Sequence, residues 1–152
     1  MAGGDAEDEE LTIQEEQLVD DPSGFRMLVA CILLNATRGD SVRPMLPELF
    51  DRWPTSYDLA GADDDLERLL RPLGLWRQRA EKLRRLAAMW EIDPLVRGPR
   101  SWLKVGLYPG CGRYAADSWR IFAEGDLSRR VSPDPNDVAL RRRLAELREE
   151  AA

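Results

Sequence analysis

The sequence predicts an all-α fold, and three observations lead to this expectation. Apolar residues recur at i, i+3, i+4 and i+7 along most of the 152 residues. Proline, glycine and capping residues lie between these stretches, where helices start and stop. No stretch alternates polar and apolar residues for long enough to form a sheet. Because 152 residues make one domain of ordinary size, we expect a compact multi-helix bundle around one core.

The N-terminal segment differs from the rest of the chain in its charge. Residues 1–21 contain nine acidic and no basic side chains, and the whole chain has a net charge of −6. Taking those nine from the 28 acidic residues leaves 19 against 22 basic residues, so residues 22–152 carry a net charge of +3. Residues 1–20 also have few apolar side chains, which predicts a disordered acidic tail before a domain over residues 21–152. The alternative is a short helix on the apolar residues of this segment, which are Leu11, Ile13 and Leu18.

Helical patterns begin directly after this segment. The first helix is predicted from four apolar positions on one face, Phe25, Leu28, Val29 and Ile32. The Asp-Pro-Ser-Gly stretch before it is typical of a helix start. A second apolar set extends to Trp53 and consists of Val42, Leu46, Leu49 and Phe50. Pro44 and Pro47 confine any regular helix there to irregular first turns.

Two short helices and one long helix are expected next. Thr55 and Asp58 have the spacing of a capping box, which opens the first short helix. Residues 63–71 are predicted to form the second, which Pro72 stops. The long helix has a basic face opposite an apolar stripe formed by Ala80, Leu83, Ala87 and Trp90.

The last third of the chain is expected to begin with a loop over residues 94–99. Two further helices are predicted around residues 101–105 and 111–122. The final helix starts near Asn136 and buries a stripe formed by Leu140, Leu144 and Leu147.

The composition excludes several kinds of chemistry. The chain has no histidine, so a histidine general base, a Ser-His pair and a histidine metal ligand are all excluded. Cys31 and Cys111 are too few for a four-thiolate zinc or iron–sulfur site, and we expect no metal site. Without a secretory leader they indicate a reduced, cytoplasmic location. The longest apolar run, residues 27–34, is too short to cross a bilayer, so no membrane association is expected.

Residues 107–115, with the sequence LYPGCGRYA, carry the most informative motif. Gly110 and Gly112 lie between two predicted short helices and allow a tight turn. The amides that follow lie at a helix N-terminus, an arrangement that suits a phosphate group. Taken alone, such a turn is also typical of an ordinary connection between helices.

Three blocks of sequence together resemble a known family. They are CILLNAT at residues 31–37, LLRPLGL at 69–75, and the hairpin with DSWRIF over 110–122. Their order and spacing resemble the helix-hairpin-helix/Gly-Pro-Asp (HhH-GPD) DNA glycosylase superfamily, which includes endonuclease III and the adenine mismatch glycosylases. Within it, the likeness is greatest to the glycosylase domains of methyl-CpG-binding thymine glycosylases. The likeness covers about residues 22–150.

The resemblance implies a catalytic aspartate at the start of the helix that follows the hairpin. Asp137, with Leu140 and Arg142 after it, meets the family's spacing of an aspartate, an aliphatic residue and a basic residue. Asp134 is the alternative, because it ends a second family pattern of valine, any residue, proline and an acidic residue. An ionised carboxylate beside C1′ would stabilise the positive charge that develops on the deoxyribose and could orient water.

Other positions carry implied roles as well. Bifunctional members have a lysine two positions after the second hairpin glycine, where this chain has Tyr114, so the resemblance implies a monofunctional enzyme with Tyr114 in the base pocket. Leu75 matches an apolar wedge that fills the gap left by the extruded base. Ala36 occupies the position where thymine glycosylases carry an arginine that enters the duplex. The further residues expected to contact DNA are Thr37, Gly110, Gly112, Arg113 and Arg142.

The resemblance implies a monofunctional base-excision glycosylase that removes thymine or uracil opposite guanine from double-stranded DNA and leaves an abasic site. The alternatives are a non-catalytic helix-hairpin-helix DNA-binding protein and a glycosylase for alkylated bases. No iron–sulfur cluster is expected because the thiolates are lacking. The family resemblance allows a monovalent cation on the hairpin's backbone carbonyls. We expect a monomer, associated with the nucleoid if the source is bacterial.

Overall fold

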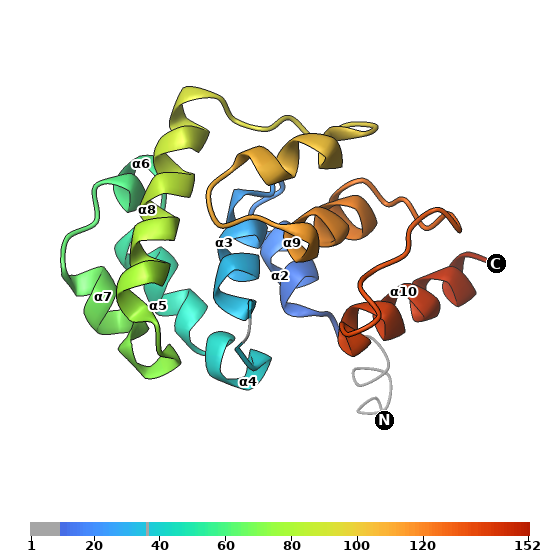
Figure 1. The fold of residues 1–152 in the computed structure, drawn as a ribbon, viewed down its shortest axis with the longest axis horizontal. Coiled ribbons are helices and arrows are strands. Elements are labelled where there is room, and N and C mark those ends of the chain that lie inside the picture. Colours follow the sequence, from blue (N-terminus) through green and yellow to red (C-terminus); the bar gives the residue numbers. More distant parts are fainter. Residues whose placement is uncertain (1–9, 36) are drawn as a thin grey trace.

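The computed structural model describes residues 10–35 and 37–152, and these residues form helices and no strand, as predicted (Figure 1). The α-helices of the first half are α2 (Ile13–Asp20), α3 (Phe25–Leu34), α4 (Gly39–Val42), α5 (Met45–Arg52), α6 (Ser56–Ala60) and α7 (Asp65–Leu70). Those of the second half are α8 (Trp76–Ile92), α9 (Arg113–Ser118) and α10 (Val138–Ala151). The described residues also form two 3₁₀ helices, η1 (Arg71–Leu73) and η2 (Ser101–Leu107), and one π-helix, η3 (Trp119–Ala123).

Helix α3 is the centre of the core, and α2, α8 and α9 pack against it. It is apolar on nearly every side, so Met27, Leu28, Val29 and Leu33 are completely buried. Trp119 is also completely buried, and its ring lies 6.5 Å from that of Trp90. The sequence pattern therefore identified the central helix correctly.

Helix α10 packs through a second, smaller cluster at one side of the bundle. Leu140 and Leu144 are buried there together with Ile121 and Val131, and Leu147 packs against them. The apolar stripe predicted for this helix is confirmed. As a result, the N-terminal end of α10 is held beside the rest of the bundle (Figure 1).

The disorder predicted for residues 1–20 is wrong for residues 13–20, which form α2. Thr12 caps this helix in a capping box with Glu15, and Ile13 is only 6% exposed. The acidic composition was misleading because one of these charges is paired: the Glu15 carboxylate accepts two hydrogen bonds of 2.9 Å from Arg143 on α10. Residues 1–9 of the predicted tail lie outside the described residues.

Elsewhere the predicted helices are present with local differences. The predicted capping box at Thr55 and Asp58 is confirmed at the start of α6. The helix predicted over residues 101–105 is a longer 3₁₀ helix, and the one predicted over 111–122 divides into α9 and a π-helical turn. Among the described residues, no helix is both long and apolar enough to cross a membrane.

Candidate active site

The ends of α2, α3, α9 and α10, together with the short helix α4, meet around a cleft of about 740 Å³. The N-terminal end of α2 contributes Thr12 and Gln14, and the C-terminal end of α3 contributes Asn35. Tyr114 lines the cleft from the start of α9, and Asp137 lines it from the start of α10. Because helix ends carry unpaired backbone groups and polar capping residues, this junction brings several polar side chains to one concave surface.

Asp137 is the N-cap residue of α10. Its Oδ1 accepts a hydrogen bond of 3.1 Å from the backbone amide of Leu140, and its own amide donates to the Asp134 carbonyl at 2.9 Å. A carboxylate at a helix N-terminus is stabilised in its ionised form. Asp134 also lines the cleft, but it lies in the preceding turn, where its Oδ1 accepts from the amide of Asn136 at 2.8 Å. Both candidate carboxylates predicted from the sequence are therefore at the cleft.

Tyr114 is held by a side chain that the sequence analysis missed. Gln14 is 5% exposed, and its Nε2 donates to the Tyr114 hydroxyl at 2.7 Å and to Ser118 Oγ at 3.2 Å. Burial raises the pKa of Tyr114, so its phenol is neutral near pH 7. The only local signal for Gln14 was its place three residues before Gln17, which is also buried, on the inner face of α2.

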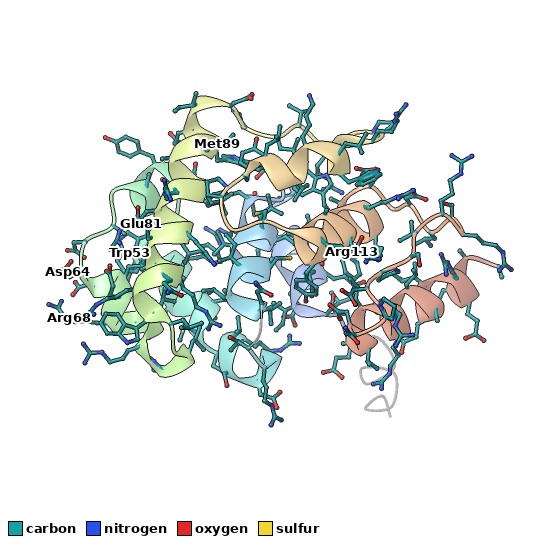
Figure 2. All side chains as sticks on the ribbon, in the orientation of Figure 1. Trp53, Asp64, Arg68, Glu81, Met89 and Arg113 are labelled. Carbon is teal, nitrogen blue, oxygen red and sulfur yellow. The ribbon has the colours of Figure 1, made fainter. Side chains whose placement is uncertain are left out.

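Arg113 and Asp117 tie α9 to the segment that leads into α10. Arg113 Nε lies 3.5 Å from Asp117 Oδ2, and its Nη2 donates to the carbonyl of Ser132 at 2.6 Å. The backbone of Asp134 lies beside the Asp117 carboxyl and acts to lower its pKa. Burial raises the pKa of Asp117, and the neighbouring Arg113 opposes this rise. Figure 2 places Arg113 on α9, beside this segment.

Two buried polar atoms of the described residues lack a hydrogen-bond partner, and both belong to this cleft. They are Thr37 Oγ1 and Asp117 Oδ2. Arg113 approaches the latter without hydrogen-bond geometry. Both atoms therefore lie in the same cleft as the two candidate carboxylates.

The hairpin glycines lie outside the cleft lining. Gly110 has a φ of 79°, and a Cβ atom there would lie 3.1 Å from Ile32 Cδ1, so the turn requires glycine. Gly112 caps α9 and has no atom within 4 Å of the position of a Cβ, which leaves its backbone accessible.

The remaining predicted residues lie apart from the cleft or outside the description. Leu75 precedes α8, is 62% exposed and has a φ of 47°. Arg142 is exposed on α10 and does not line the cleft, whereas its neighbour Arg143 pairs with Glu15. Ala36 lies outside the described residues.

The two cysteines are buried and unpaired. Burial raises the pKa of both Cys31 and Cys111 to about 12, so neither is a thiolate near pH 7. They are therefore poor candidates for a nucleophile.

Comparisons with known proteins agree with this fold. The family described as "HhH-GPD superfamily base excision DNA repair protein" matches residues 29–149. The chain is 32% identical over 117 residues to the Methyl-CpG-binding domain protein 4-like protein of Arabidopsis thaliana, covering 76% of this chain and 24% of that protein. It is 36% identical over 112 residues to Thymine-DNA glycosylase of Aeropyrum pernix, covering 73% of this chain and 48% of that protein.

A solved structure shows the same fold. The endonuclease III chain of a non-covalent complex with DNA matches with a TM-score of 0.60 and 24% identity, over 74% of this chain and 56% of that chain. The chain thus spans between about a quarter and a half of the length of these two curated relatives.

Proposed function

Because this chain belongs to the HhH-GPD superfamily of base excision DNA repair proteins, we propose that it is a monofunctional DNA glycosylase for thymine or uracil opposite guanine. The observation that carries this proposal is the cleft in which Asp137, at the start of α10, faces the same space as the neutral phenol of Tyr114. The names of the two curated relatives, one of them a thymine-DNA glycosylase, favour a pyrimidine substrate.

The chemistry of base release requires a negative charge in this position. As the bond between C1′ and the base nitrogen breaks, the base leaves with both electrons and the sugar becomes positively charged. The Asp137 carboxylate stabilises that charge and accepts one proton from a water molecule, whose oxygen bonds to C1′. The accepted proton is returned to the departing base, so that an abasic site and a neutral base remain.

Asp137 is the stronger of the two candidate carboxylates. It lies at the N-terminus of a helix of 14 residues, where the partial positive charge of the helix end lies beside its carboxyl group. Both carboxylates accept one backbone hydrogen bond through Oδ1, but Asp134 lies in the turn before the helix and not at its first turn. We therefore assign the electrostatic and general-base role to Asp137 and a turn-forming role to Asp134.

The lack of a lysine among the described residues of the cleft supports the monofunctional assignment. A lyase reaction in this superfamily requires a primary amine to form a Schiff base with the sugar. The chain has two lysines, Lys82 and Lys104, and neither is among the described residues that line the cleft. Tyr114 instead provides an aromatic wall whose hydroxyl is fixed by Gln14. Such a wall suits a flat, extruded base.

The test uses duplexes with a single T:G, U:G or alkylated base, followed by alkali to cleave abasic sites. We expect product from T:G or U:G duplexes with the wild-type chain and none with Asp137→Asn. Product from the alkylated duplex alone would show that the substrate is an alkylated base and not thymine or uracil. No product from any duplex would overturn the proposed activity in favour of a DNA-binding role. Loss of activity in Asp134→Asn alone would reverse the assignment of the two carboxylates. A covalent adduct trapped by borohydride would overturn the monofunctional assignment.

A further inference from the structure

We propose that Arg79 is a positioning residue that holds together the two loops which handle the duplex around an extruded base. One loop lies before α8 and presents Leu75, and the other follows α3 and presents Thr37. This inference rests on the proposed function, since it concerns how the base reaches the cleft. Figure 1 shows the first turn of α8 and the last turn of α3 at the same lower side of the bundle as the first turn of α10.

Arg79 is an unusual arginine for a DNA-binding surface, because it is 6% exposed. Within the part of the chain that the structure describes, it forms no ion pair with a carboxylate. Burial lowers its pKa. A buried guanidinium without a counter-charge is unfavourable in itself, so its hydrogen bonds must serve the structure around it.

Those hydrogen bonds join two segments that are distant in sequence. Nη1 donates to the carbonyl of Leu73 at 3.1 Å, and Nη2 donates to the carbonyl of Asn35 at 3.0 Å. The backbone amide of Arg79 also donates to the Leu75 carbonyl at 3.0 Å. One residue therefore holds the chain on both sides of Gly74 and links it to the end of α3. The planar guanidinium can reach both carbonyls at once, whereas the single ammonium of a lysine lacks this fork geometry.

The loop that Arg79 holds presents a side chain suited to enter DNA. Leu75 is 62% exposed although it is apolar, and its φ of 47° is a backbone conformation that leucine rarely adopts. Strained backbone of this kind persists only where the surrounding structure enforces it, and it is common at functional sites. Exposed apolar side chains on rigid turns are used as wedges between base steps.

The other loop borders the cleft itself. Asn35 ends α3, and the amide of Thr37 donates to the carbonyl of Leu34 at 3.1 Å. Asn35 and Thr37 both line the cleft that would receive the base. By binding the Asn35 carbonyl, Arg79 sets the distance between the wedge and the entrance to the cleft. A misplacement of either loop would impair extrusion of the base more than the bond cleavage that follows it.

The experiment compares Arg79→Met with Arg84→Met on the same helix. Arg84 is the control because it also binds two backbone carbonyls, those of Ala62 and Asp63, although unlike Arg79 it is ion-paired, with Glu67. It lies on the side of α8 that faces α6 and α7, away from both loops. Loss of either arginine is expected to destabilise the fold, but only Arg79→Met should change how the duplex is distorted.

Two measurements are made on each variant. The first is the fluorescence of 2-aminopurine placed beside the target base, which rises when the base is extruded and needs no bond cleavage. The second is the single-turnover rate of uracil release from a U:G duplex and from a duplex with uracil opposite an abasic-site analogue, where the base is already unpaired. For Arg79→Met we expect loss of the fluorescence rise and a fall of roughly tenfold to a hundredfold on U:G, with little change on the unpaired substrate. Arg84→Met should keep the wild-type ratio of the two rates.

Each outcome decides one question. An equal fall on both substrates in Arg79→Met, or an unchanged fluorescence rise, overturns the positioning role. If Arg79→Met does not fold, Arg79→Lys is measured in the same way, and a wild-type ratio and fluorescence in that variant overturn the proposal. If the wild-type chain releases no base from any duplex, the proposed glycosylase activity fails, and the fluorescence measurement still tests Arg79 by itself.

Discussion

Replacing Asp137 by asparagine separates its two roles, because asparagine can cap a helix but cannot ionise. In the structure, Oδ1 of Asp137 accepts from the Leu140 amide at 3.1 Å, and the side-chain oxygen of asparagine can accept the same bond. Asp137→Ala removes both the cap and the charge. The pair of variants therefore differs in stability but not in the loss of the carboxylate.

The expected magnitudes follow from these contacts. Asp137→Asn loses only the interaction of the charge with the helix N-terminus, about 0.3–1 kcal/mol of unfolding free energy. Asp137→Ala loses the cap as well, about 0.5–2 kcal/mol. At about 2–4 °C per kcal/mol for a chain of this size, Asp137→Asn should stay within a few degrees of the wild-type melting temperature. Both variants should lose at least about a hundredfold in the rate of base release, because the developing charge on the sugar has no counter-charge.

The assay is single-turnover release from a U:G duplex with alkali cleavage, combined with thermal unfolding of each variant. Equal loss of activity with unequal loss of stability is the expected result. A rate for Asp137→Asn within about threefold of the wild type would refute the reasoning, because the carboxylate would then contribute little to the barrier. An inactive Asp137→Ala beside an active Asp137→Asn would show that capping alone is the role of this residue.

Three further changes test other parts of the structure. Gly110→Ala should lower the free energy of unfolding in denaturant by roughly 1–3 kcal/mol, because Gly110 has a φ of 79° and an added Cβ would lie 3.1 Å from Ile32. Gly112→Ala should leave the free energy of unfolding nearly unchanged, since an added Cβ there meets no atom within 4 Å. Glu15→Gln should lower the free energy of unfolding near pH 7 by about 1–3 kcal/mol. Burial alone would raise the pKa of Glu15, but its hydrogen bonds, first of all from Arg143, lower the pKa below 4.5. The difference in unfolding free energy between Glu15→Gln and the wild type should therefore persist above pH 4.5. It should vanish as the pH falls through the lowered pKa of Glu15. Leu75→Gly should be about 1 kcal/mol more stable than Leu75→Ala in thermal unfolding, because only glycine adopts the left-handed backbone without strain. Both variants should release base poorly from paired duplexes. Equal melting temperatures of the two variants would contradict the inferred strain.

Local signals predicted most of the fold. The apolar face of α3, the capping box of α6 and the leucine stripe of α10 each depend on residues within one or two turns, and all three are present in the structure. Helix α2 was mistaken for a disordered segment because its stability depends on the rest of the chain. Its pair of Glu15 with Arg143 joins residues 128 positions apart, which no local pattern reveals.

The same distinction explains the site. Asp137, Asp134, Tyr114, Arg113 and Thr37 were expected from motifs, and the structure brings all of them to one cleft. Which of them take part in the chemistry stays a prediction. Gln14 and Asp117 were missed because each acts through a partner that only the folded chain supplies: the hydroxyl of Tyr114 for the first, and the segment before α10 for the second.

The negative formal charge of the cleft bears on how the proposed glycosylase would bind a duplex. Its described lining contains three carboxyl groups, on Asp117, Asp134 and Asp137, against the two guanidinium groups of Arg43 and Arg113. A formal charge of −1 favours a sugar that becomes positive but repels phosphate. Under the proposed function, the duplex is therefore bound by elements around the rim, namely the hairpin and the two loops joined by Arg79. In such an arrangement the rim determines whether a base enters, and the carboxylate acts only on the base that the rim has delivered.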